Sequence, residues 1–277
     1  MKRHAFLVIA ITLALQAPAQ DVPEVYRDLE NNYHQDAFEA CVRMEKVVET
    51  FIHDRLDTLA SNSLFYIGDS YNQLGDRKKA LTYFERENKI LQSLGMTQTI
   101  DFSNSLNNLA YLYLQDGNYI SAGITADELI VNDRKIFAPT DNNFVTTVIY
   151  VADIYIQLDR LKDAETLLST TLKHHGKSTT SRGLLLSKLG DLYSFSGEYS
   201  RASTSLKEAL GIHMEQSGEE SPEYTSTAIA LGVLYINQGK YPEAQEIFEV
   251  ALSILDPSDN AYASVLNNHA LVLQSLG

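Results

Sequence analysis

The side chains best suited to covalent chemistry are one thiol and a few imidazoles. Cys41 is the only cysteine, and the nearest imidazoles before and after it belong to His34 and His53. A cysteine nucleophile needs a base held beside it, and intervals of seven and twelve residues match no nucleophile motif. His174 and His175 are adjacent, so on a helix they point in different directions and make a poor metal pair. We therefore expect a packed or half-exposed thiol.

Other catalytic patterns are missing from the sequence. It has no phosphate-cradling glycine loop, no paired-histidine zinc motif and no serine elbow. An enzyme complete within these 277 residues is the least favoured interpretation. The sequence predicts no catalytic residues, no metal and no cofactor.

Noncovalent recognition is the chemistry that the sequence favours. Paired asparagines occur in similar contexts within residues 105–110 (SLNNLA) and 265–270 (VLNNHA). Side-chain amides both donate and accept hydrogen bonds, so a row of them can pair with the backbone of an extended peptide. Tyrosines add flat, amphipathic contact area. These features favour a binding function.

The formal charge restricts the class of partner. It is −14, and removal of an N-terminal segment carrying Lys2 and Arg3 would make it −16. Such a surface repels phosphate backbones and anionic lipid, so neutral or basic polypeptide is favoured over nucleic acid or a membrane surface. Acidity that serves only solubility is the plain alternative. A single cysteine also excludes an intramolecular disulfide.

A repeat must position these side chains. Its clearest copy has Leu231, Gly232, Tyr235, Gly239, Ala244, Phe248 and Ala251. Taking Gly232 as the marker, equivalent small residues are Gly68, Ala110, Ala152, Gly190 and Ala270. The intervals are 42, 42, 38, 42 and 38 residues. Units of this size cannot bury their own apolar faces and must stack on their neighbours.

Each position in the repeat has a physical reason. Leu64, Ile67 and Tyr71 are three and four residues apart, which places them on one face of a first helix. The turn at Gly75 ends that helix, because glycine adopts a left-handed conformation without steric cost. Ala80 and Phe84 begin the stripe of a second helix. Gly68 and Ala80 allow close approach of the two helices.

The pattern resembles the tetratricopeptide repeat, and its longer period and paired asparagines resemble the kinesin-light-chain-like subgroup. The resemblance covers residues 61–277, with the last repeat incomplete. It implies an all-α fold, a right-handed α-solenoid of stacked antiparallel helix pairs. The first helices of such a solenoid line a concave groove.

The resemblance also implies a peptide-binding groove. Its predicted residues are Asn62, Tyr66, Asp69, Asn104, Asn107, Asn108, Tyr111, Tyr150, Asp153, Lys188, Asp191, Asn267 and Asn268. In the related light chains the asparagines equivalent to the pairs 107–108 and 267–268 hold cargo peptide. The alternative is that these amides only cap and solvate helices. A carboxylate clamp is disfavoured, because the groove offers chiefly one lysine amid aspartates; these favour a basic or uncharged ligand segment.

The N-terminus predicts export. Lys2 and Arg3 precede an apolar stretch of about ten residues, and Ala17-Pro18-Ala19 supplies the small residues of a cleavage site. We expect a signal peptide over residues 1–19, cleaved after Ala19, and no membrane insertion of the mature chain. The periplasm, the outer surface and the medium are all possible destinations. A buried N-terminal helix is the alternative.

The two ends of the repeat array differ from its middle. Residues 20–60 predict a degenerate capping helix pair, because terminal repeats are commonly atypical. The sixth copy stops at Gly277, before any second helix. We expect the native chain to continue past residue 277.

Two functional classes remain. The chain is an exported scaffold that binds proteins or peptides, or it is the sensory or substrate-recruiting front of a longer protein. In the second case, the resemblance implies a caspase-like peptidase or histidine kinase part beyond residue 277.

Overall fold

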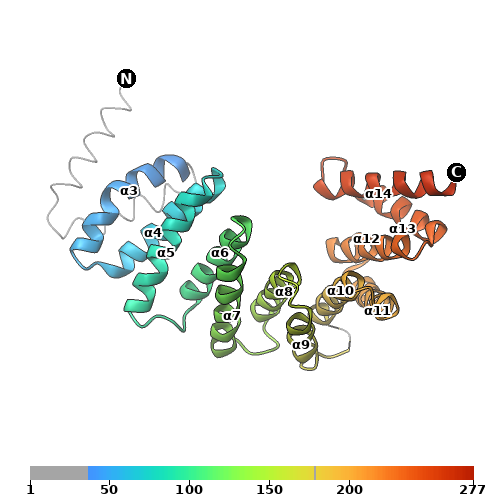
Figure 1. Ribbon diagram of the computed structural model, residues 1–277, viewed down its shortest axis with the longest axis horizontal. Coiled ribbons are helices and arrows are strands. Elements are labelled where there is room, and N and C mark those ends of the chain that lie inside the picture. Colours follow the sequence, from blue (N-terminus) through green and yellow to red (C-terminus); the bar gives the residue numbers. More distant parts are fainter. Residues whose placement is uncertain (1–36, 178) are drawn as a thin grey trace, which may run out of the picture. The chain divides into compact units, whose positions relative to one another are not determined.

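Figure 1 shows the computed structural model, which describes residues 37–177 and 179–277. This part of the chain forms twelve α-helices and no strand, which confirms the all-α prediction. The predicted signal peptide and the first helix of the capping pair lie outside the described residues. The described residues divide into two compact units, whose boundary in the sequence falls between Ile136 and Phe137.

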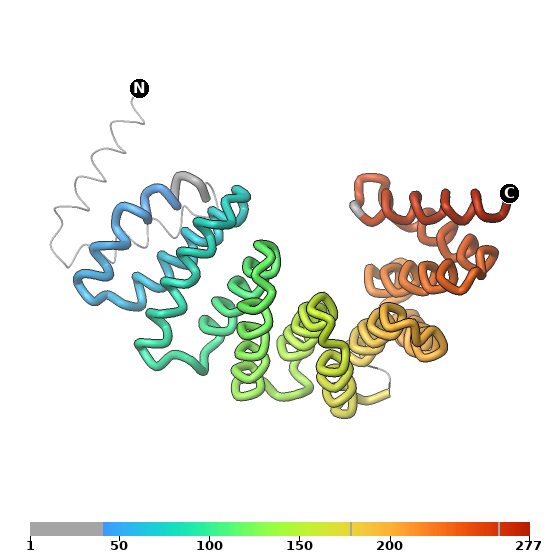
Figure 2. The backbone as a smooth tube through the Cα atoms, viewed as in Figure 1, coloured from blue at the N-terminus to red at the C-terminus, as the bar shows by residue number. Residues whose placement is uncertain are grey.

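The first unit contains five described helices. They are α3 (Ala37–His53), α4 (Asp57–Gln73), α5 (Arg77–Ser93), α6 (Ile100–Gln115) and α7 (Tyr119–Ile136). α4 packs against α5 and α6 against α7, while α3 packs on α4 and α5 on α6. The unit is therefore a stack of antiparallel hairpins, as the tube in Figure 2 shows.

The second unit continues the same arrangement. Its helices are α8 (Asn142–Gln157), α9 (Leu161–Leu172), α10 (Thr180–Phe195), α11 (Tyr199–Ser217), α12 (Pro222–Asn237), α13 (Tyr241–Ile254) and α14 (Asn260–Leu276). The two helices of each hairpin pack against each other. Each second helix also packs on the first helix of the next hairpin within the unit. The stacking of helix pairs predicted from the repeat is confirmed within each unit.

The turns between paired helices have the predicted left-handed residue. Gly75, Gly117, Gly197 and Gly239 have φ between +70° and +79°. In the first of these turns the backbone N–H of Asp76 donates to the carbonyl oxygen of Tyr71 at 2.9 Å. The weaker copy holds the same conformation with Asp159, at φ +59°. The turn geometry is thus common to all five complete repeats, although one lacks glycine.

Helices of a hairpin approach most closely at the small residue of the repeat. A Cβ added to Gly68 would lie 3.1 Å from the Phe84 ring. At Gly190 it would lie 2.5 Å from Leu206. At Gly232 it would lie 2.7 Å from Phe248. In each case the contacted residue lies sixteen positions after the glycine. The repeat places a small residue and a large apolar residue at this interval because the two residues meet between the helices of the hairpin.

The described ends of the array also follow the pattern. α3 buries Cys41, Met44, Val48 and Phe51, each at most 1% exposed, and is the predicted second helix of the capping pair. α14 buries Val265 and Val272 completely but leaves four leucines between 44% and 48% exposed. Among the described helices, none has the length and apolarity needed to cross a membrane.

Candidate functional site

Seven predicted groove residues lie in the first unit, all on first helices of hairpins. α4 carries Asn62, Tyr66 and Asp69, and α6 carries Asn104, Asn107, Asn108 and Tyr111. The side chains of Asn104, Asn107 and Tyr111 are exposed, and the other four are half-buried. None of the seven is fully buried, so each is partly accessible to a ligand.

Three of these residues line one pocket between α4, α5 and α6. The pocket has a volume of about 200 Å³ and is lined by Asn62, Phe65, Tyr66, Glu87, Asp101 and Asn104. α4 supplies two aromatic rings and an amide, and α6 supplies an amide and a carboxylate. The chemistry of this lining is amphipathic and acidic, with no cation in it.

Glu87 is the most unusual residue of the pocket. Its side chain belongs to α5 and is 3% exposed, and its Oε2 has no hydrogen-bond partner among the described residues. Burial raises the pKa of Glu87 to about 8, the Asp101 carboxylate adds to that rise, and the Ser105 hydroxyl opposes it. Near neutral pH this carboxyl is therefore largely protonated.

The position of Glu87 follows from the periodicity of α5. The helix buries Ala80, Phe84, Glu87 and Leu91, which are spaced four, three and four residues apart. That spacing is one face of an α-helix, so the carboxyl stands among apolar side chains and beside the buried amide of Asn88. Its burial is imposed by the fold and not by a flexible loop.

In the second unit, three predicted groove residues form an ion-paired cluster. Lys188 Nζ lies 2.8 Å from Asp153 Oδ1 of α8 and 3.1 Å from Asp191 Oδ2 of α10. Burial alone would lower the pKa of Lys188, but the two carboxylates outweigh it and the pKa is raised. Lys188 is thus already neutralised within the chain, which agrees with the argument against a carboxylate clamp.

The ion pairs with Lys188 also reduce the negative charge that Asp153 and Asp191 can present to a ligand. Burial raises the pKa of Asp191, with Lys188 opposing that rise. One lysine shared by two carboxylates leaves a single net negative charge for a ligand. The remaining predicted residues are Tyr150 on α8, half-buried, and Asn267 and Asn268 on α14, exposed and half-buried.

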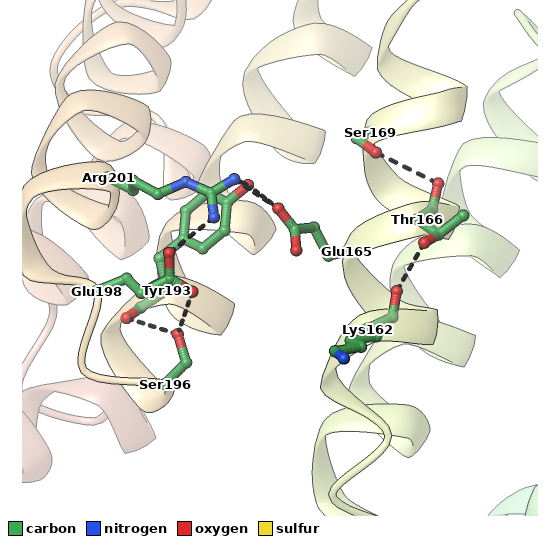
Figure 3. A network of polar contacts seen from close by, with 8 residues as sticks. All are labelled: Lys162, Glu165, Thr166, Ser169, Tyr193, Ser196, Glu198 and Arg201. Carbon is green, nitrogen blue, oxygen red and sulfur yellow. Dashed lines mark hydrogen bonds and ion pairs between the residues drawn. The ribbon is translucent and has the colours of Figure 1, made fainter.

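The tyrosine of the repeat links successive hairpins instead of facing a ligand. Tyr193 Oη of α10 donates to Glu165 Oε1 of α9 at 3.0 Å, and Arg201 of α11 lies 3.8 Å above its ring. Figure 3 shows Arg201 reaching both the tyrosine hydroxyl and Glu165. Tyr113 donates in the same way to Glu85 at 2.7 Å. These contacts join α10 to α9 and α6 to α5, in each case a first helix to the second helix before it.

The covalent-chemistry candidates are not assembled into a site. Cys41 is 1% exposed, its Sγ lies 4.0 Å from the Ile67 carbonyl oxygen, and burial raises the pKa of its thiol to about 11. His34 lies outside the described residues, and the exposed His53 contacts Asp54. Within residues 37–177 and 179–277, no three His, Cys, Asp or Glu side chains are grouped as metal ligands.

Sequence reasoning missed Phe65, Glu87 and Asp101 as pocket residues. Nothing in the sequence around Phe65 or Asp101 distinguishes them from other aromatic and acidic residues of the chain. Glu87 does carry one, because it interrupts the apolar stripe of a second helix between Phe84 and Leu91. A charged residue on a core face is the signal that could have drawn attention to it.

Comparisons with known proteins agree with this architecture. Residues 181–256 and residues 62–86 each match a family profile described as Tetratricopeptide repeat. No curated protein matches the chain significantly.

Solved structures with a similar fold come from several organisms. BtubC (BKLC) from P. vanneervenii is 19% identical, with a TM-score of 0.61 over 73% of this chain and 84% of that one. A putative kinesin light chain with nearly identical TPR-like repeats from Podosopora anserina is 20% identical, with a TM-score of 0.58 over 70% of this chain and 93% of that one.

A third similar structure is larger. It is a signal transduction ATPase of the STAND class with a tetratricopeptide repeat sensor, PH0952 from Pyrococcus horikoshii, which is 16% identical with a TM-score of 0.64. The match covers 93% of this chain and 42% of that one.

Proposed function

Because the chain is a tetratricopeptide repeat protein that resembles kinesin-light-chain-like members, we propose that it is a scaffold for another polypeptide. The ligand lies against the first helices of the hairpins, and the chain performs no catalysis of its own. The observation that carries this proposal is the row of accessible asparagines and tyrosines on α4 and α6, with a pocket among them.

The chemistry of these side chains fits an extended peptide. Amides at Asn104, Asn107 and Asn108 offer donors and acceptors along one helix, which suits backbone groups regardless of ligand sequence. The partly accessible rings of Tyr66 and Tyr111 supply amphipathic contact area. The acidic charge favours a neutral or basic ligand and disfavours nucleic acid.

The proposed location is outside the exporting cell's cytoplasm, after cleavage near Ala19. The basic start, the short apolar stretch and the small residues before Gln20 support it. N-terminal sequencing of the protein recovered from the producing cell should give Gln20 first. Recovery of chains that still begin at Met1 would contradict export by this route.

The binding proposal is tested by affinity capture followed by paired substitutions. The partner captured from the periplasm or medium should bind the wild-type chain, and the double variant Asn107→Ala/Asn108→Ala should bind it at least about tenfold more weakly, since each lost hydrogen bond contributes roughly 1 kcal/mol. Gln216→Ala, an exposed amide on the second helix α11, is the matched control. Equal affinity of all three proteins would show that the first helices do not hold the ligand.

A second candidate is the sensory or recruiting region of a longer protein. The similarity to PH0952, a signal transduction ATPase with a tetratricopeptide repeat sensor, favours it. Reading the codons downstream of Gly277 tests this candidate. A membrane span, a Cys/His peptidase pair or a kinase region there would select it over the free scaffold.

A further inference from the structure

We propose that the pocket between α4, α5 and α6 receives a lysine or arginine side chain of the bound polypeptide, with Glu87 and Asp101 as its counter-charges. This inference rests on the proposed function, because it assigns one residue type of the same ligand. It concerns the first unit alone.

The strongest observation is the unsatisfied carboxyl oxygen of Glu87. Only 3% of this residue is exposed, and its Oε2 has no hydrogen-bond partner among the described residues. A buried polar atom left unpaired is costly, and the cost is larger when the group is charged. An ammonium or guanidinium group entering the pocket supplies both the missing donor and the opposite charge.

The other lining residues suit a long cationic side chain. Asp101 is exposed, so a second carboxylate is placed where an approaching cation first meets the protein. The rings of Phe65 and Tyr66, whose centroids are 5.7 Å apart, offer apolar surface for the methylene stem and an aromatic face for the charge. A volume of about 200 Å³ suits one such side chain better than a larger ligand.

The two amides of the pocket connect it to the peptide backbone. Asn62 belongs to α4 and Asn104 to α6, so neighbouring hairpins each contribute one amide to the lining. With the cation in the pocket, these amides offer donors and acceptors to the ligand's main chain. An anionic side chain would instead face two carboxylates.

The protonation state of Glu87 gives the proposal a second readout. Burial raises its pKa to about 8, and the titratable groups that line the pocket beside it are Tyr66 of α4 and Asp101 of α6. A bound cation favours the ionised carboxyl, so binding near neutral pH releases a proton. Affinity for a cationic ligand should consequently rise between pH 6 and pH 8.5.

The test uses the whole chain and two capped peptides, each with two glycines on either side of a central residue. One peptide has lysine at the centre, and the other has norleucine, which keeps the stem without the charge. NMR titration at pH 7.5 should give at least about tenfold tighter binding of the lysine peptide, since a charge-assisted hydrogen bond contributes roughly 1.5–3 kcal/mol. That preference should increase at pH 8.5 and decrease at pH 6.

Glu87→Gln should weaken the preference, because only Asp101 then faces the charge, and it should abolish the pH dependence. Glu128→Gln is the matched control, because it removes one negative charge from an exposed position on the second helix α7, outside the pocket lining, and should preserve both. Equal binding of the two peptides, or an unchanged preference in Glu87→Gln, would overturn the proposal. Butylamine binding as tightly as the lysine peptide would overturn the assignment to a polypeptide.

The outcome is separable from that of the proposed function. A captured partner that needs Asn107 and Asn108 but binds Glu87→Gln normally would leave the scaffold function standing and remove the cationic pocket. If the choice between the two peptides depends on Glu87 but the partner binds the Asn107→Ala/Asn108→Ala variant normally, the cationic pocket stands and the proposed use of those asparagines falls.

Discussion

Glu87 is unfavourable for the stability of its hairpin, and in the proposed pocket the same carboxyl attracts a cation. Its carboxyl lies on a face of α5 that also buries alanine, phenylalanine, asparagine and leucine. Ionising it within the core is unfavourable, because burial raises its pKa to about 8. An apolar residue at this position would stabilise the hairpin but could not attract a cation.

Glu87→Gln should stabilise the protein increasingly as pH rises. The pKa in the folded state is raised above the unfolded value, so the folded chain binds more protons between about pH 4.5 and pH 8 and loses stability as pH rises there. The variant lacks this loss. The difference in unfolding free energy between variant and wild type should grow by up to about 1.4 kcal/mol per pH unit in that window.

Denaturant unfolding of both proteins at pH 5, 6.5 and 8 measures this difference. Other titrating groups affect both proteins alike, so they cancel in the comparison. A difference that stays constant over the three pH values would show that Glu87 is ionised or solvated in the folded state.

Gly190 should be far less replaceable than Gly211, although both are helical glycines. An added Cβ at position 190 meets Leu206 at 2.5 Å, whereas at position 211 it meets nothing within 4 Å. Gly190→Ala should therefore cost roughly 1–3 kcal/mol through overpacking. Gly211→Ala should gain roughly 0.5–1 kcal/mol, because alanine is the better helix former.

Thermal unfolding of the two variants checks the contrast in sign. A similar change in melting temperature for both would mean that helices α10 and α11 are not in close contact at Gly190.

At the scale of elements, the turn of each hairpin is defined by one left-handed residue. Gly117 has φ +76° with nothing near its added Cβ, so its replacement is strained by conformation alone. Asp159 holds the equivalent place at φ +59°. Aspartate tolerates this region better than most residues but less well than glycine.

Substitutions at these two turns should have opposite effects. Gly117→Ala should destabilise by about 1 kcal/mol, because alanine bears the left-handed penalty. Asp159→Gly should stabilise by about 0.5 kcal/mol, since relief of strain exceeds the added freedom of the unfolded chain. Chemical denaturation of both variants gives the signs, and destabilisation by Asp159→Gly would show that the aspartate side chain supports its turn.

The contact between successive hairpins depends on a tyrosine hydroxyl. Tyr193→Phe removes the hydrogen bond to Glu165 and the hydrogen bond from Arg201 while keeping the ring, so it should cost about 1 kcal/mol. Tyr199→Phe, at a side chain 38% exposed, should change little. Equal unfolding free energies for the two variants would exclude an energetic role for the link.

The elements themselves were predictable because their causes are local. Leu64, Ile67 and Tyr71 mark one helix face, and Gly75 marks its end, so the hairpin follows from periodicity and turn chemistry. The groove positions follow only when the resemblance assigns first helices to the concave side. The structure places seven of them on the first helices α4 and α6, and their role in binding remains a prediction.

The ion-paired cluster and the pocket could not be predicted from the sequence, because both depend on contacts between repeats. The pairing of Lys188 with Asp153 joins residues 35 apart on different hairpins, and its geometry is set by how α8 and α10 pack. The pocket likewise combines residues of α4, α5 and α6. Composition and spacing contain no information on which oxygen of Glu87 remains unpaired.

At the scale of the whole molecule, stability is distributed between neighbouring helices. Within each unit, the described helices pack mainly on their neighbours in sequence, and neither unit has a single central core in the described residues. In such an array the stability of a helix depends on its own hairpin and on the adjoining interface. Protection from hydrogen exchange should therefore vary along the chain instead of being uniform.

α14 should exchange its amide hydrogens faster than α10 and α11. It packs mainly on α13, with a smaller contact to α12, and leaves Leu266, Leu271, Leu273 and Leu276 between 44% and 48% exposed. α10 and α11 lie inside the second unit, with helices packed on both sides. Local opening of α14 exposes little additional apolar surface, so its free energy is lower. Hydrogen exchange followed by mass spectrometry measures this order, and protection of α14 equal to that of α10 would show that its leucines are covered in solution.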